Sequence, residues 1–211
     1  MERSEFLARV RERLGGSEVP PLPGLRTVTP ASGDGRGFDR FAEELSKLSS
    51  EARRLRPGEI ADHVAELGEG ARTAVVAEGV GGYRAAVEEG LARAACAILP
   101  LTRETAASAD LGVTGADFGV ASTGSVLVRM GPEAPRVASL LPPLHLVILP
   151  EERLLPGFEE LFAAWPERAR HAAQTVLITG PSRTADIELS IVRGVHGPER
   201  LAVIVVSSTE G

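Results

Sequence analysis

Residues 180–188 hold the densest group of chemically useful side chains in the sequence, because two hydroxyls, a guanidinium and two carboxylates follow a Gly-Pro pair. Arg183 can present a planar fork of N–H donors to a carboxylate or phosphate, and each charge-assisted bond contributes roughly 1.5–3 kcal/mol. Ser182 and Thr184 flank it with hydroxyls. We therefore expect Arg183, Ser182 and Thr184 to bind a small anion, unless Arg183 pairs with Asp186 or Glu188 and only fixes the loop.

Asp117 is the candidate catalytic residue. It lies between Ala116 and Phe118 in an apolar segment, where an ionised carboxylate needs a partner or has its pKa raised. A raised pKa suits a general base. The alternative is that Asp117 caps the backbone of a turn at Thr114 and Gly115, and the sequence leaves both readings open.

A short run of small residues, 122–125, separates two β patterns. Such a run can turn backbone N–H groups toward a ligand, as anion-binding nests do. Thr123, Gly124 and Ser125 are therefore candidate ligand-binding residues. A plain hairpin loop explains the same pattern.

His145 follows Pro142-Pro143 at the start of a strand pattern, and His196 lies in a Gly-Val-His-Gly-Pro turn. Both positions allow an imidazole to reach the rim of a cleft, so both are candidate ligand-binding residues, with a purely structural role as the alternative. His63 and His171 lie on charged helical patterns, and we expect them to be solvated. No Cys or carboxylate stands at ligand spacing from these histidines, which predicts no metal site.

Hydrophobic periodicity predicts a mixed α/β chain. Helical spacing covers residues 38–55, 60–67, 83–94 and a stretch near 156–164, and strand patterns cover 73–77, 97–99, 118–121, 126–129, 144–149, 175–178 and 201–206. The continuous apolar runs at 145–149 and 201–206 are typical of strands buried on both faces of a parallel sheet. We expect a three-layer, mainly parallel α/β domain with a β-hairpin insertion at 118–129.

The N-terminal segment differs from the rest. Residues 3–14 show amphipathic helical spacing, and residues 17–37 are rich in Pro and Gly. This predicts a helix and linker arm over 1–37 and an α/β domain over 38–211. The arm is expected to dock on its own domain or on a neighbouring subunit, which would make a homo-oligomer.

Charge and composition limit the kinds of partner, cofactor and location that we expect. The net charge is −6, which opposes a phosphate backbone and argues against nucleic acid. The single cysteine, Cys96, cannot form an intrachain disulfide or hold an iron–sulfur cluster, which normally takes four thiolates. The sequence has no run of 18 apolar residues and no signal-peptide pattern, so we expect no membrane span and a cytoplasmic location.

Several motifs occur together in order. They are Thr-Gly-Ala-Asp-Phe at 114–118, Leu-Leu-Pro-Pro-Leu-His at 140–145, the 180–188 stretch, and Gly-Val-His-Gly-Pro at 194–198. With them the chain resembles the LUD domain, specifically the lactate utilization protein C family, over roughly residues 58–206. The resemblance implies a fold like that of sugar-phosphate isomerases and CoA-transferases.

The resemblance also implies a function. It suggests a component of a bacterial system that oxidises L-lactate to pyruvate, acting as an accessory or substrate-handling subunit that binds no cofactor itself. The iron–sulfur clusters would belong to separate partner subunits. Family sequences commonly have a glutamate where this chain has Ser122, which counts against a covalent acyl-carboxylate mechanism.

Two other functions remain open at this point. One is a free-standing enzyme of the same fold that acts on a small anionic metabolite, such as a sugar phosphate or a thioester. The other is a regulatory or structural protein whose pocket has lost its ligand.

Overall fold

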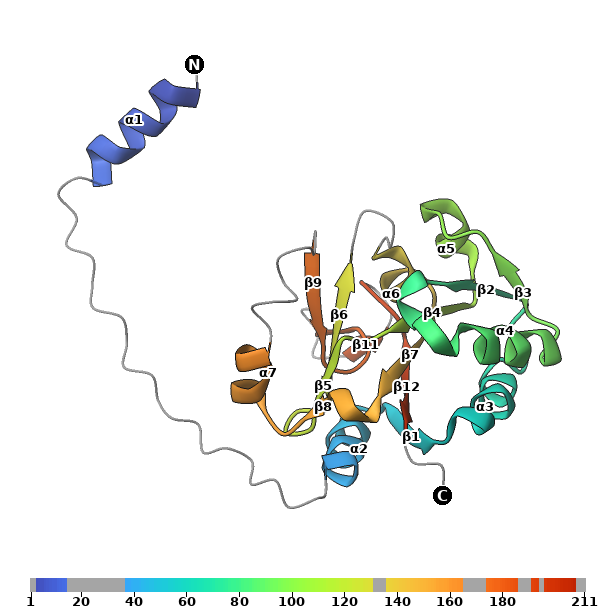
Figure 1. Cartoon of the computed structure of the whole chain (residues 1–211). Coiled ribbons are helices and arrows are strands. Elements are labelled where there is room, and N and C mark those ends of the chain that lie inside the picture. The colour runs from blue at the N-terminus through green and yellow to red at the C-terminus, as the bar shows by residue number, and fades with distance from the viewer. Residues whose placement is uncertain are drawn as a thin grey trace.

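Figure 1 shows a computed structural model of the chain, which describes residues 3–14, 37–130, 136–164, 174–185, 191–193 and 196–207. Its main sheet has six strands in the order β1-β12-β7-β4-β2-β3, and every neighbouring pair is parallel. The strands are β1 (Glu51–Leu55), β2 (Thr73–Val76), β3 (Ala97–Leu99), β4 (Leu111–Gly115), β7 (Leu144–Pro150) and β12 (Arg200–Val206). The expected mainly parallel α/β fold is confirmed.

Helices cover one face of the main sheet. α3 (Ile60–Leu67) and α4 (Arg84–Arg93) lie there (Figure 1). The short helix η1 (Pro57–Glu59) directly precedes α3, and η2 (Glu78–Tyr83) contributes Val80 to the same core. Ile60 and Val64 of α3 and Leu91 of α4 are fully buried against alternate residues of β2, β4, β7 and β12. This alternation explains the continuous apolar runs, because every second side chain of these strands faces each layer.

A second, four-stranded sheet packs on the opposite face. Its order is β8-β5-β6-β9, with β5 (Phe118–Val120), β6 (Ser125–Met130), β8 (Leu154–Leu155) and β9 (Gln174–Ile178). β5 and β6 pair antiparallel, which confirms the predicted hairpin. β9 extends the hairpin on the β6 side, so the insertion is wider than the sequence pattern indicated.

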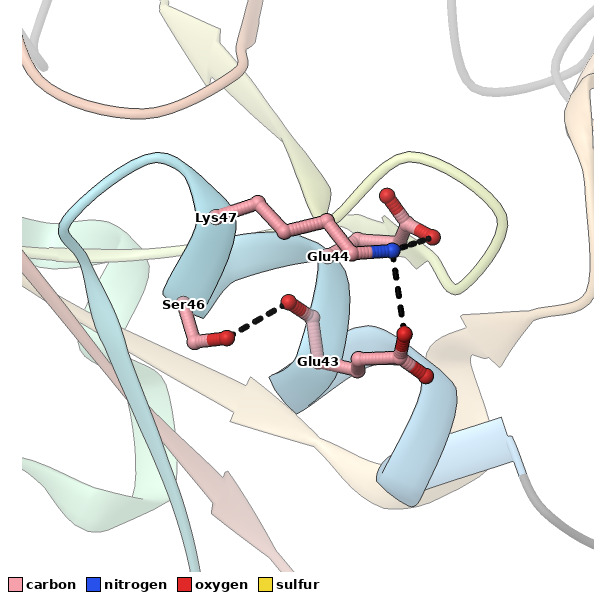
Figure 2. Close-up of polar contacts among 4 residues, drawn as sticks. All are labelled: Glu43, Glu44, Ser46 and Lys47. Atoms are coloured by element: carbon pink, nitrogen blue, oxygen red, sulfur yellow. Dashed lines mark hydrogen bonds and ion pairs between the residues drawn. The ribbon is translucent and has the colours of Figure 1, made fainter.

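Helix α2 (Gly37–Lys47) packs beside this second sheet and contributes Phe41 and Leu45 to the shared core. Its outer face is charged, and Lys47 Nζ lies 3.0 Å from a carboxylate oxygen of Glu43 and 2.9 Å from one of Glu44 (Figure 2). The Ser46 hydroxyl donates to the Glu43 carbonyl oxygen nearby. The periodicity of α2 therefore reflects one buried face and one solvated face.

The remaining elements are short. α5 (Arg103–Ser108) and α6 (Val137–Leu140) cover the main sheet near β2 and β4, η3 (Glu151–Arg153) follows β7, and α7 (Phe158–Ala164) packs on β5 and β8. β10 (Arg183–Ala185) and β11 (Ile191–Arg193) form a separate antiparallel pair. α1 (Arg3–Leu14) confirms the first predicted helix, and its Phe6, Leu7 and Val10 are exposed. The linker lies outside the described residues, so the docking of the arm stays a prediction.

Three sequence-based expectations are wrong. The helix predicted over 38–55 ends at Lys47. Residues 51–55 instead form β1, the edge strand of the main sheet, which pairs in parallel with β12. Thr114 and Gly115 belong to β4 and do not form a turn. His63 is buried, with 7% of its surface exposed, and its Nδ1 lies 3.2 Å from Glu66.

Candidate functional site

A cavity of about 250 Å³ lies between the two sheets, where β7 and β12 begin. His145 and Leu201 line it from the main sheet, and Leu177 and Ile178 line it from β9. The other lining residues come from α6 and two connecting segments, and they are Ser139, Leu140, Thr179, Gly180, Pro181, Ser182, His196, Gly197 and Pro198. The cavity therefore brings together Ser182, His145 and His196, three of the residues predicted from sequence.

His145 has no exposed surface, although it lines the cavity. Its Nε2 lies 2.8 Å from the Thr114 hydroxyl on the neighbouring strand β4. Burial lowers the pKa of the imidazole to about 3, because the charged form loses its hydration in the interior. The ring is therefore neutral at physiological pH, and it is suited to hydrogen bonding more than to charge pairing.

A chain of hydroxyl groups runs from the β5–β6 turn to the cavity. Thr123 Oγ1 lies 2.7 Å from Ser125 Oγ, and Ser125 Oγ lies 2.7 Å from Thr179 Oγ1. Thr179 lines the cavity, so Thr123 and Ser125 reach the site through it. Gly124 has a φ of 65° and lies against α2, where a Cβ atom would come within 2.8 Å of the Leu45 backbone nitrogen. The structure thus gives Gly124 a packing role.

The segment around Ser182 lies against residues 197 and 198, which belong to the described part of the Gly-Val-His-Gly-Pro motif. The Ser182 N–H donates to the Pro198 carbonyl oxygen over 2.9 Å, and the Ser182 side chain packs against Gly197. His196 is exposed at the same edge of the cavity. Two motifs that lie apart in the sequence therefore form one wall of the site.

Arg183 and Thr184 belong to β10, whose backbone pairs Arg183 with Arg193 and Thr184 with Val192. Their side chains, like the whole of Asp186 and Glu188, lie outside the described residues. The predicted anion contact of Arg183 and Thr184 therefore stays a prediction. The backbone places Arg183 next to the cavity, because Arg183 directly follows Ser182 in its wall.

Asp117 is buried and pairs with Arg129 across the β5–β6 hairpin. Arg129 Nη2 donates a hydrogen bond of 3.1 Å to Oδ1, and Nε lies 2.9 Å from Oδ2, so the two side chains form an ion pair. The backbone N–H of Asp117 donates to Leu127. Asp117 is absent from the lining of the cavity, and these contacts explain its burial without catalysis. Its catalytic role remains a prediction from sequence.

Replacing Arg129 with methionine is expected to lower the free energy of unfolding by about 1–2 kcal/mol, because the buried Asp117 carboxylate loses this cation. The loss should fall short of that for a fully buried pair, because Arg129 is 39% exposed and water screens it. Urea unfolding at neutral pH measures the effect.

The matched control is Lys47→Met, which removes the exposed cation between Glu43 and Glu44 (Figure 2). We expect no measurable change there, because exposed pairs contribute little. Equal losses in the two variants would contradict the role given to Arg129.

A second hollow of about 510 Å³ lies at the carboxyl end of β2 and is lined by Val76, Glu78, Arg84 and Leu101. The glycine-containing turn of η2 borders it, and a Cβ on Gly115 would lie 1.8 Å from the Gly79 carbonyl oxygen, so this turn lies directly on β4. Arg84 already contacts Glu88 at 2.7 Å. The hollow is open and polar, and its one described cation is paired.

We also searched the described residues for metal ligands and for a reactive thiol. No group of three or more His, Cys, Asp or Glu residues there could hold a metal ion. Cys96 is buried, and burial raises the pKa of its thiol, so the reactive thiolate is disfavoured.

Comparison with known protein families shows which family the chain belongs to. A family model described as the LUD domain matches residues 83–206, which is more than half of the chain. The chain belongs to the LUD domain family. The match includes His145 and Ser182, so the cavity lies within the LUD domain.

Curated relatives of this LUD-domain protein share parts or most of its length. It is 40% identical over 109 residues to "Lactate utilization protein C" of Halalkalibacterium halodurans, which covers 49% of this chain and 46% of that protein. The chain thus spans about half the length of the first curated relatives it matches. "Lactate utilization protein C" of Deinococcus radiodurans is 26% identical over 203 residues, which covers 96% of this chain and 94% of that one.

One solved structure has a similar fold. It is a crystal structure of a DUF162 family protein from Deinococcus radiodurans, with a TM-score of 0.65 and 21% identity, covering 82% of this chain and 97% of that chain. At this identity the likeness concerns the fold alone. Within the described residues, no helix of the LUD-domain protein is long and apolar enough to cross a bilayer.

The sequence did not identify Thr114, Ser139 and Thr179 as site residues. Thr114 was interpreted as part of a turn, and its hydroxyl reaches His145 only because β4 and β7 are neighbours. Thr179 directly precedes the 180–188 cluster, so a window one residue wider contains it. No sequence signal marks Ser139, since α6 is a short apolar helix.

Proposed function

We propose that this LUD-domain protein acts in lactate utilization, as an accessory or substrate-handling subunit in the oxidation of L-lactate to pyruvate. The observation that carries the proposal is the relative named lactate utilization protein C from Deinococcus radiodurans, which aligns over almost the full length of both chains. The half-length match to the Halalkalibacterium halodurans protein of the same name supports it.

The electron balance of the reaction supports an accessory role. Converting L-lactate to pyruvate releases two electrons and two protons, and an acceptor must take them. The chain has one cysteine, too few for an iron–sulfur cluster. We infer that separate iron–sulfur subunits accept the electrons and that this chain presents or retains the small carboxylic acid.

The test uses the full chain with an affinity tag, expressed in its own host grown on L-lactate or on glucose. Iron and acid-labile sulfide should co-purify from the lactate-grown cells only. The purified chain alone should not reduce a dye acceptor with L-lactate, whereas the co-purified assembly should. Dye reduction by the isolated chain, or the absence of iron–sulfur proteins from the lactate-grown preparation, overturns the proposal.

A second candidate function is a free-standing enzyme acting on a small phosphorylated or thioester metabolite. The open hollow at the carboxyl end of β2 favours it, because ligands of open α/β sheets bind at carboxyl ends of strands. A thermal-shift screen of L-lactate, pyruvate, sugar phosphates and CoA separates the two functions. A ligand at a hundred times its Kd stabilises by about 2.7 kcal/mol, so a strong response to one phosphorylated compound selects this second function.

A further inference from the structure

Helix α1 carries an apolar stripe that is exposed to solvent. Phe6 is 51% exposed, and Leu7 and Val10 are exposed beside it. Their spacing of one and four residues places the three side chains on one side of the helix. A helix of 12 residues is only marginally stable by itself in water. α1 therefore needs a surface on which its apolar stripe can pack.

The second sheet has an apolar surface on the face that points away from the main sheet. Val176 and Ile178 of β9 pack toward the main sheet, so Leu177 between them points outward. Leu177 pairs with Leu127 of β6, and α7 covers the β5 and β6 part of this outer face. Leu177 is 40% exposed and Phe162 of α7 is 67% exposed. The layer formed by α7 and β9 therefore leaves two large apolar side chains uncovered.

Charge favours contact between α1 and this outer layer. α1 has four arginines against two glutamates, and Arg11 and Arg13 border its apolar stripe at helical spacing. α7 has Glu159 and Glu160 and no basic residue. Arg129 lies on the same outer face, but its charge is already balanced by the ion pair across the hairpin. A basic helix thus meets an acidic one wherever the two apolar surfaces are brought together.

The arm joins the domain close to the same layer. Gly37 is the first residue of α2, and a Cβ atom on it would lie 3.9 Å from the Leu154 side chain of β8. α7 packs on β8 and β5. The 22 residues from 15 to 36 connect α1 to Gly37, and a chain of that length can span up to about 75 Å. This exceeds the roughly 40 Å diameter of a domain of this size, so α1 can reach α7 and β9 of its own chain.

We propose that α1 folds back on its own chain and packs Phe6, Leu7 and Val10 against Phe162 and Leu177 on the outer face of the second sheet. The arginines of α1 then face the acidic α7. The same chain is favoured over a second copy because a tether of this kind gives an effective concentration of about 1 mM. An anionic membrane fits α1 less well, since three apolar side chains bury little area in a bilayer.

The experiment measures amide hydrogen exchange of residues 3–14 in the full chain, over a wide range of protein concentration. Docking with a Kd of about 0.1 mM at an effective concentration of about 1 mM should slow exchange about tenfold. This protection should not change on dilution, because the contact is intramolecular. Protection that is lost on dilution assigns α1 to a second copy and overturns the proposal. Protection that appears only with phosphatidylglycerol vesicles also overturns it, as does unprotected exchange throughout.

Two variants of α1 separate docking from helix propensity. Leu7→Asp places a charge in the apolar stripe and should remove the tenfold protection of α1. Ala8→Asp is the matched control, because Ala8 is exposed and lies outside the stripe, and it should keep the protection of the parent. Aspartate lowers helix propensity to the same extent at both positions. Equal losses in the two variants would therefore leave no role for docking and would overturn the proposal.

Three variants of the domain locate the docking surface. Leu177→Thr and Phe162→Ser should each reduce the protection of α1 about threefold to tenfold, because each removes apolar contact area. Ile98→Thr is the matched control, since Ile98 lies on β3 and is 38% exposed, close to the value for Leu177. It should leave α1 protected as in the parent. Parent-like protection in both Leu177→Thr and Phe162→Ser excludes this surface and overturns the proposal.

Discussion

Gly112→Ala is expected to lower the free energy of unfolding by about 1–3 kcal/mol. A Cβ atom on Gly112 would lie 1.9 Å from the Ala138 carbonyl oxygen and 2.9 Å from Pro142. The backbone of α6 must therefore move away from β4. That movement displaces Ser139 and Leu140, which line the cavity beside His145. Urea unfolding measures the effect.

The control for this prediction is Gly58→Ala. Gly58 has nothing within 4 Å of an added Cβ and does not have a positive φ. The same substitution there should be neutral or stabilise by about 0.4–1 kcal/mol, because alanine restricts the unfolded chain. If Gly112→Ala proves as stable as the parent, then α6 is not held against β4 by this close approach, and the proposed geometry of the cavity wall is wrong.

The core of the fold could be predicted from the sequence because its signals are local. The runs at 144–150 and 200–206 are apolar at nearly every position, and they form adjacent central strands β7 and β12. The helix predicted to continue through residues 48–55 is wrong because a long-range contact decides the structure there. Leu48, Ala52 and Leu55 continue the spacing of α2, but Glu51–Leu55 hydrogen-bonds to β12, about 150 residues later. Long-range pairing of this kind overrides local periodicity.

In the candidate site, too, some residues could be predicted from the sequence and their contact partners could not. His145, His196 and Ser182 were identified from their residue types and the turns around them, and the cavity contains all three. Their partners could not be predicted, because each contact crosses between strands or segments. Thr114 reaches His145 across β4 and β7, and Thr179, directly after β9, reaches Ser125 of β6. Asp117 was identified as a buried carboxylate, but its partner Arg129 depends on the hairpin register.

Acid is expected to destabilise the protein through His145 well before the carboxylates titrate. Burial holds the pKa of His145 at about 3, against 6.5 for a free imidazole. As the pH falls below 6.5, the unfolded chain takes up a proton there and the native chain does not, so stability is lost. The loss extends from about pH 6.5 down to about pH 3, and between pH 7 and pH 5 it should amount to about 2 kcal/mol.

The measurement compares urea unfolding of the parent and of His145→Gln at pH 7 and at pH 5. The difference between the two proteins cancels the other histidines, and His145→Gln should lack the 2 kcal/mol component of the loss. Carboxylates with lowered pKa, such as Asp110, whose Oδ2 accepts from the Arg72 and Thr73 N–H groups, add a loss of the same sign only at lower pH. A parent and variant that lose equal stability over this window would show that His145 becomes charged in the folded protein, and its place as a neutral, desolvated hydrogen-bonding group would then be wrong.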